Sequence, residues 1–267
     1  MSVATCRTCG LKISTIDAPP TLSYGAIDHA AYEQSIGILR RIQAESIVRA
    51  VRTLVEPPRS WTDVGCGFGF LLAAAHAHGF AVHGIEPDRS ACAEARARVG
   101  NVECGEFDRV LTDVDVLSTL DVIEHIPPDR LGEFATRVRE SLREGGVWVI
   151  KVPSSEGLAF RVAHLAPRLA AGAVKRLWQF GYTHPHTVYF NEKSLRAFVT
   201  RHGFEVASVR YVSDFPVRTI VPRLRIDASI TRWQVPLFAS ALFAIRAVEG
   251  VWRKTDALVM IVRRARS

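Results

Sequence analysis

The sequence predicts an α/β protein built around a largely parallel sheet, on three observations. From residue 61 onward, short apolar stretches alternate with longer amphipathic stretches at helical spacing. Glycine follows three of the amphipathic stretches, at Gly79, Gly100 and Gly145, where helices commonly end. The chain contains no internal repeat and no low-complexity tract. Strands that alternate with helices in this way place the strands parallel and the helices on the faces of the sheet.

The individual elements follow from the same patterns, taken in chain order. A first helix is expected over 30–55, and Pro57 and Pro58 end it. Strands are expected at 61–64, 80–86, 102–104, 114–120 and 147–152, with helices at 71–78, 88–99 and 128–143 between them. A helix at 194–202 and strands at 205–211 and 258–262 complete the pattern. The segments 157–190 and 212–256 interrupt it.

Composition and charge limit the class of protein. Of the 267 residues, 48% are hydrophobic and 23% are charged, which is typical of a globular domain and excludes a disordered chain. Residues 157–267 carry 18 basic and 6 acidic residues, a net charge of +12, whereas the whole chain has +7. Such a basic part suits an anionic substrate, a membrane surface or nucleic acid. The alternative is that arginine is simply the favoured surface residue of this chain.

Three features bear on location. The longest charge-free apolar run near the C-terminus covers residues 233–245, and these 13 residues are fewer than the roughly 20 of a spanning helix. The N-terminus shows no apolar leader segment. The five cysteines are an odd number within the first 104 residues, which predicts reduced thiols and a cytoplasmic protein.

A glycine-rich turn is the strongest local signal. Residues 61–70 read WTDVGCGFGF, so a strand leads into a turn and then into a helix. The glycines allow a tight turn and the close approach of a ligand, and the helix N-terminus offers free N–H groups. Dinucleotide-binding turns read G-x-G-x-x-G, whereas the glycines here are spaced G-x-G-x-G.

Two acidic residues indicate which ligand this turn binds. Glu86 ends the next strand, where a carboxylate accepts both ribose hydroxyls of either NAD or an adenosyl ligand. Asp63 lies within the strand just before the turn, where it would repel a pyrophosphate. It suits a ligand with an ammonium group and a sulfonium charge. An NAD-dependent oxidoreductase is therefore disfavoured.

Five motifs in order resemble those of the class I S-adenosylmethionine (SAM)-dependent methyltransferases. They are VGCGFG, GIEPD, DVLSTLDVIEHIPP, LREGGVWVIKVPS and HTVYFNEKSLRAFVTRHGFEV, and they span about residues 55–210. The chain is most similar to the methyltransferase families that include the ubiquinone-biosynthesis O-methyltransferases. The resemblance implies a Rossmann-like fold with a seven-stranded, mostly parallel sheet, helices on both faces and a helical lid. It also implies SAM as cofactor.

The resemblance also implies roles for individual residues. Those expected to hold the methionine moiety are Asp63, Gly65, Cys66 and Gly67. Glu86 would bind the ribose hydroxyls, and the residues expected around the adenine are Pro87, Asp88, Glu106 and Phe107. Leu120 would lie near the reactive end of the cofactor. Tyr24 and Tyr32 match a cofactor-covering segment loosely, and ordinary packing is the favoured interpretation for both.

Methyl transfer needs an acceptor atom aligned with the methyl carbon of SAM. An O–H or N–H acceptor also needs a base of near-neutral pKa. His125 follows the fourth strand at the ligand-binding edge and is the first candidate for the base. The alternative is a helix-entry residue that orders Glu124. His184 is expected to reach the substrate or to act with Glu124 or His125 on a divalent ion. Because the ligands show no regular spacing, we assign no metal.

Several acceptor classes are disfavoured. The place after the fourth strand lacks the [D/N/S]-P-P-aromatic turn of amino-group methylation, and no cysteine stands there for cytosine chemistry. Zinc-finger and RNA-binding motifs are absent, so nucleic acid is not the expected partner. We therefore expect methyl transfer to an oxygen of a small apolar or lipid-linked metabolite. The alternative is a non-catalytic SAM-binding regulatory module that docks to membrane or RNA through its basic C-terminal part.

Three regions are expected. The first region, residues 1–55, carries a lone Cys6-x-x-Cys9 pair and a helix that covers the cofactor. The second, 56–211, forms the SAM-binding core with a lid at 157–190. The third, 212–267, forms a basic, apolar helical insertion and the last strand. The cysteine pair resembles half of a zinc ribbon, and a relic is favoured over a shared zinc site. The apolar stripe within 235–252 suits a lid, a homodimer face or an anionic membrane interface. The expected location is thus cytoplasmic or peripheral at a membrane.

Overall fold

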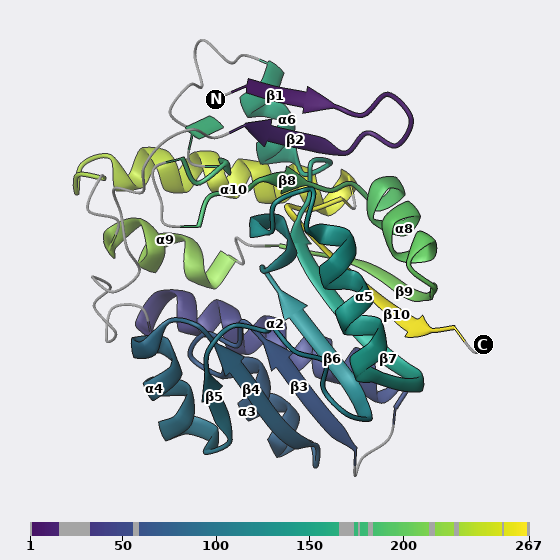
Figure 1. Ribbon diagram of the computed structural model, residues 1–267. Helices are drawn as coiled ribbons and strands as arrows, with labels where there is room; N and C mark the ends of the chain where they lie inside the picture. The colour runs from purple at the N-terminus through teal and green to yellow at the C-terminus, as the bar shows by residue number, and fades with distance from the viewer. Residues whose placement is uncertain are drawn as a thin grey trace.

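The computed structural model describes most of the chain, drawn in Figure 1. The described residues are 2–15, 33–55, 59–165, 174–175, 177–180, 184–213, 217–226, 230–252 and 254–265. Tyr24, Tyr32 and the prolines at 57 and 58 lie outside these ranges, so the predictions made for them are not addressed by the structure.

A seven-stranded sheet forms the centre of the molecule. Its strands are β3 (Ser60–Val64), β4 (Ala81–Glu86), β5 (Val102–Cys104), β6 (Val114–Leu120), β7 (Leu142–Pro153), β9 (Phe204–Val212) and β10 (Ala257–Arg264). Their order across the sheet is β5-β4-β3-β6-β7-β10-β9. The pairs among β5, β4, β3, β6 and β7 are parallel, whereas β10 is antiparallel to both β7 and β9. The predicted seven-stranded, mostly parallel sheet is confirmed.

Helices cover both faces of this sheet because its strands are apolar on both sides. In β7, Trp148 and Ile150 belong to one core cluster, together with the helices α5 (Leu131–Ser141) and α8 (Glu192–Arg201). Val147 and Val149 alternate with them and belong to the opposite cluster. The helices on that side are α2 (Ile38–Arg52), α3 (Phe70–Ala77) and α4 (Arg89–Val99).

Several helix boundaries differ from the predicted ones by a few residues, including those at the start of the first helical segment and at the end of α5. The described part of the first helical segment opens with a π-helical turn, η2 (Glu33–Gly37), before α2 begins. The helix predicted to reach residue 143 ends at Ser141, and Leu142 already belongs to β7. The reason is a bulge in β7: Leu142 pairs with Val114, but the next paired residue is Val147, opposite Val116. Glycines 145 and 146 occupy this bulge.

A small second sheet contains the N-terminal cysteine pair. Strands β1 (Ser2–Thr5) and β2 (Lys12–Thr15) form a hairpin, and β2 also pairs with β8 (Val188–Tyr189). Cys6 and Cys9 lie in the hairpin turn, which Asn191 holds by donating a hydrogen bond to the carbonyl of Cys9 at 3.1 Å. The hairpin therefore adjoins the loop that precedes β8 (Figure 1).

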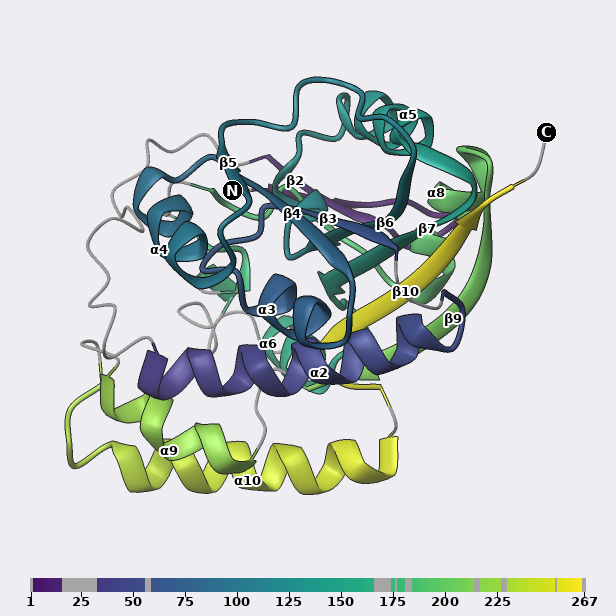
Figure 2. The same ribbon diagram turned by 90° about the horizontal axis from the view of Figure 1, so that it is seen from below.

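The C-terminal insertion forms a helical layer of its own. Helices α9 (Val217–Ile226) and α10 (Val235–Trp252) pack on each other through a small apolar cluster that includes Ile220, Leu224 and Ala239. Figure 2 shows this pair lying beyond α2, on the outside of the molecule. Helix α6 (Leu158–Leu165) contacts α10. Among the described residues, no helix is long and apolar enough to cross a membrane.

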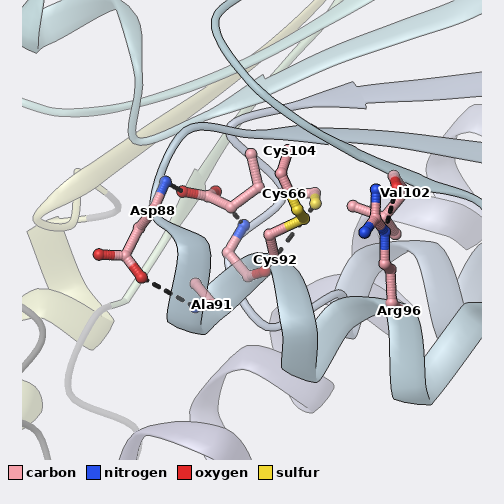
Figure 3. Close-up of a disulfide and its surroundings, with 9 residues drawn as sticks. Cys66, Asp88, Ala91, Cys92, Arg96, Val102 and Cys104 are labelled. Carbon is pink, nitrogen blue, oxygen red and sulfur yellow. Dashed lines mark hydrogen bonds between the residues drawn. A yellow bond between two sulfur atoms is a disulfide. The ribbon is translucent and has the colours of Figure 1, made fainter.

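A disulfide joins Cys92 in α4 to Cys104 at the end of β5 (Figure 3). The prediction of reduced thiols was therefore wrong for these two residues. Helix α4 leads directly into β5, which brings the two Cα atoms within 5.6 Å, inside the range that a disulfide spans. An odd number of cysteines excludes complete pairing but not a single bridge. Cys6, Cys9 and Cys66 are free.

Removing this disulfide should destabilise the protein. The two cysteines are 12 residues apart, and a loop of that length corresponds to about 3 kcal/mol of lost unfolded-state entropy. We expect the double variant Cys92→Ala, Cys104→Ala to melt several degrees lower than the parent, as measured by calorimetry. Dithiothreitol should lower the Tm of the parent but not that of the double variant. An identical Tm for parent and variant would contradict the bridge, and Cys6→Ser is the matched control.

Candidate cofactor and acceptor site

The glycine turn after β3 has three glycines in the left-handed region, Gly65, Gly67 and Gly69. Gly65 has φ +69°, and a Cβ there would lie 2.6 Å from Cγ2 of Val122, so a larger residue does not fit. Gly67 has φ +53°, and a Cβ there would meet open space. The backbone at Gly67 is therefore accessible to a ligand, while Gly65 lets the turn pack against the segment that follows β6.

Glu86 joins this turn to the ends of β4 and β5. One carboxylate oxygen accepts the Gly67 N–H at 2.7 Å, and the other accepts the Asp88 N–H at 2.9 Å. The Glu86 carbonyl accepts the Gly105 N–H at 3.0 Å. Burial raises the pKa of Glu86 above its ordinary value. Each carboxylate oxygen keeps a second acceptor position, which is what two ribose hydroxyls require.

Asp63 is a buried acid on the central strand. It lies opposite Ser118 in the β3–β6 register and accepts a 2.6 Å hydrogen bond from the Ser118 hydroxyl. Ser118 in turn accepts the indole N–H of Trp61 at 2.8 Å. Burial raises the pKa of Asp63 to about 7. A cationic group bound beside it would favour the ionised form, because an opposite charge stabilises the carboxylate.

The other residues predicted to bind the cofactor surround these two acids. Cys66 is buried, and a Cβ on Gly84 would lie 2.9 Å from its Sγ, so its side chain faces the core. Asp88 caps α4 by accepting the Ala91 N–H at 2.8 Å, as Figure 3 shows. Phe107 is buried edge-on against Phe134, with 5.6 Å between the ring centroids. Of the remaining three residues, Pro87 and Glu106 are exposed and Leu120 is half-buried at the end of β6.

The residue after β6 anchors a charge network. Asp121 has φ +57°, rare for a residue with a side chain, and accepts hydrogen bonds from Lys151 Nζ at 2.7 and 2.9 Å. Arg40 of α2 donates to the same carboxylate. Burial alone would raise the pKa of Asp121, but the charges of Lys151 and Arg40 outweigh it and hold that pKa below its ordinary value. Sequence reasoning missed these three residues, although a lysine inside the apolar strand β7 was a visible signal.

Glu124, His125 and His186 come together beside this network. Each offers one ligand atom, and the three atoms lie within 4.8 Å of one another. The Glu124 carboxylate is 1% exposed, and neither oxygen has a hydrogen-bond partner among the described residues. Burial raises the pKa of Glu124 well above its ordinary value. An unpartnered buried carboxylate indicates a missing ligand, because leaving it unpaired is costly.

Hydrogen bonds orient the two imidazoles. His125 Nδ1 contacts the Pro185 carbonyl at 3.1 Å, so Nδ1 carries the proton and Nε2 is an acceptor. His186 Nδ1 contacts the Tyr189 hydroxyl at 3.2 Å. Burial lowers the pKa of His125, and it lowers the pKa of His186 to about 3. Both rings are therefore neutral at pH 7.

The loop before β8 brings the second histidine into place. Thr187 donates its N–H to the Glu124 carbonyl at 2.7 Å, and its hydroxyl donates to the Ile126 carbonyl at 2.7 Å. His184 is farther out, with its ring centroid 6.3 Å from that of His125. The structure thus places His186, rather than His184, next to Glu124. Two imidazoles and a carboxylate can hold a divalent ion, or they can bind and deprotonate a hydroxyl.

The comparisons with known proteins identify the family. A family model described as a methyltransferase domain matches residues 38–209, which is more than half of the chain. The chain therefore belongs to this methyltransferase family, and its cofactor is SAM. No curated protein sequence matches it.

Solved structures share the fold at low sequence identity. A cyclopropane synthase from Mycobacterium tuberculosis has a TM-score of 0.58 and 16% identity, over 86% of this chain and 84% of that one. The magnesium protoporphyrin IX methyltransferase of Synechocystis, solved with bound SAH, has a TM-score of 0.56 and 14% identity, over 88% and 97%. A SAM-dependent methyltransferase from Archaeoglobus fulgidus has a TM-score of 0.55 and 14% identity, over 84% and 94%. The predicted Rossmann-like methyltransferase fold is confirmed.

The raised pKa of Asp63 predicts a pH-dependent cofactor affinity. If Asp63 attracts a cationic group of the ligand, only its ionised form does so, and below pH 7 a proton must leave first. The affinity for S-adenosylhomocysteine should therefore fall by up to tenfold per pH unit between pH 7 and 5.5, as measured by calorimetry. The Asp63→Asn variant should bind S-adenosylhomocysteine weakly, with an affinity that does not change with pH. Its Tm at pH 8 should be higher than that of the parent, because the substitution removes a buried charge. A parent profile as flat as that of the variant would refute this role.

Proposed function

We propose that this methyltransferase transfers the methyl group of SAM to an oxygen atom of a small apolar or lipid-linked acceptor. The observation that carries the proposal is the unpartnered, buried Glu124 carboxylate with its two neighbouring imidazoles. Glu124 and His125 lie shortly after β6, and Val122, between β6 and these two residues, packs against Gly65 of the cofactor turn. An acceptor bound at Glu124 would therefore lie next to the cofactor.

The residues present fit the cofactor. Asp63 supplies a negative charge for its ammonium group, and the open space at Gly67, next to Gly65 and Cys66 in the same turn, leaves room for the methionine part. Glu86 supplies acceptors for the ribose. In this proposal the residues around the adenine are Pro87, Asp88, Glu106 and Phe107, and Leu120 approaches the reactive end. When bound, SAM supplies a methyl group activated by its sulfonium charge.

The protein has two tasks toward the acceptor. The first is to hold the oxygen in line with the methyl carbon and to exclude water, which most of the rate enhancement depends on. The second is to remove the hydroxyl proton. His125 is our candidate for this base, because its Nε2 is an acceptor and its buried ring is neutral. His184, whose ring centroid lies 6.3 Å from that of His125, is our candidate for a second contact to the acceptor.

The same cluster supports a second way of activating the hydroxyl. A divalent ion held by Glu124, His125 and His186 would bind the acceptor oxygen and lower its pKa. The sequence offered no regular ligand spacing because Glu124 and His186 are far apart in the chain. The two modes differ in what they require of His186, which has a role only as a metal ligand.

The cofactor assignment is tested by one substitution. Glu86→Ala removes the acceptors of two backbone N–H groups and of the ribose, so we expect affinity for S-adenosylhomocysteine to fall at least 100-fold in calorimetry. Glu103→Ala, on the neighbouring strand and paired with Arg109 at the surface, is the matched control and should bind normally. Unchanged binding by Glu86→Ala would show that our assignment is wrong.

The acceptor site is tested with methyl-labelled SAM and an extract of the host. We expect label in the organic phase, and His125→Ala should lower the rate about 10²- to 10⁴-fold while cofactor affinity stays normal. If EDTA and His186→Ala also abolish transfer, a bound metal ion activates the hydroxyl. If neither changes the rate, His125 acts as the base without a metal ion. Label in RNA or protein would refute the small-molecule acceptor. Binding without any turnover would favour a regulatory module.

A further inference from the structure

The outer face of α10 is mainly apolar in the part whose side chains the structure describes. Its exposed residues along that face are Pro236, Leu237, Ser240, Ala241, Ala244, Ala247 and Val248. Leu237 is 66% exposed and Val248 is 49% exposed. A helix that faces water normally carries charged side chains on its outer side. None of these seven residues is charged.

The opposite face of α10 already has its partner. Ala239 is buried against Ile220 and Leu224 of α9, and Val235 and Leu242 pack against the same cluster. These residues are three or four positions apart and form one side of the helix. The outer apolar face is therefore additional to the face that holds α10 on the molecule, and Figure 2 shows α10 at the periphery.

Exposed cationic and aromatic residues occur on α9 and on the turn before α10. Arg218 and Arg225 are exposed on α9, and Arg232 and Trp233 are exposed at the turn before α10. Trp233 is 75% exposed. From residue 217 to 252, the span of both helices, the sequence has five arginines and two acidic residues, Asp227 and Glu249. An apolar helix face in a layer with exposed arginines and an exposed tryptophan matches an anionic lipid surface.

A second copy of the chain is the less suitable occupant. A two-fold interface uses the same patch on both chains, so it would bring two basic surfaces together. Like charges across an interface are unfavourable, and the span of both helices offers two acids for five arginines. An anionic bilayer provides the missing negative charge.

We propose that α9 and α10 dock the protein on an anionic membrane surface, with the outer face of α10 in the interface between headgroups and acyl chains. This proposal concerns the place at which the proposed reaction occurs. Docking itself does not require that the proposed reaction be correct. The chain links this surface to the site: Lys254, just after α10, pairs with Glu156, which closely follows β7 and Lys151. The N–H of Ser154 donates to the Asp256 carbonyl at 2.7 Å. A lipid-linked acceptor would reach the enzyme on this side.

Vesicle flotation tests the proposal with the full chain. We expect binding to phosphatidylcholine vesicles that contain phosphatidylglycerol, little binding to pure phosphatidylcholine, and release by high salt. Leu237→Glu should weaken binding strongly, and Arg218→Gln and Arg225→Gln should each weaken it up to about tenfold. Val110→Glu, at an exposed apolar residue on the loop before β6, is the matched control and should bind like the parent.

Tryptophan fluorescence gives an independent readout. Trp61, Trp148 and Trp178 are fully buried, and Trp252 is the remaining tryptophan besides Trp233. In a Trp252→Phe background, a blue shift on vesicle binding should therefore come from Trp233, and the additional change Trp233→Phe should lose it. Equal binding to neutral and anionic vesicles, or full binding by Leu237→Glu, would overturn the proposal. A dimer in sedimentation that Leu237→Glu dissociates would instead make this face a self-interface. Methyl transfer measured in parallel, without vesicles, shows whether the proposed function stands when docking fails.

Discussion

The close contact between Gly65 and Val122 is the constraint on which the site depends. Parallel strands β3 and β6 are neighbours, so the turn after one and the segment after the other leave the sheet at the same edge. A Cβ on Gly65 would lie 2.6 Å from Val122, and any larger residue would push the two segments apart. The cofactor turn would then separate from Asp121 and Glu124. In the proposed function, the distance between cofactor and acceptor therefore depends on this contact.

Around this contact the protein buries acidic groups of two kinds. Asp121 is neutralised within the protein, because Lys151 and Arg40 both bind its carboxylate. Asp63 has one hydrogen bond from Ser118, and Glu124 has no hydrogen-bond partner among the described residues. Burial of an unpaired acid costs free energy that ligand binding can recover. In the proposed function, the ligands complete the site: a cationic cofactor pairs with Asp63, and a hydroxyl or a divalent ion binds Glu124.

The outer elements connect this centre to the surroundings. The Cys92–Cys104 disulfide fastens α4 to the end of β5, immediately before Glu106 and Phe107. On the other side, the pair of helices α9 and α10 is joined to the end of β7 through Lys254 and Glu156. A covalent bond thus holds α4 and β5 together beside the proposed cofactor site. The proposed docking surface lies on α9 and α10, outside the central sheet. This division agrees with a core that binds a common cofactor and an insertion that adapts the protein to its acceptor.

The sequence by itself determined the sheet, the glycine turn and the cofactor, because these depend on local patterns: strand and helix periodicity, turn glycines, and acids at strand ends such as Asp63 and Glu86. It did not determine the bulge in β7, the disulfide, or the association of Glu124 with His186 and of Asp121 with Lys151 and Arg40. Those contacts join residues from separate elements, and only the packing of the elements brings them together. The apolar stripe of α10 was visible in the sequence, but which side of it meets α9 and which faces outward was decided by the tertiary structure.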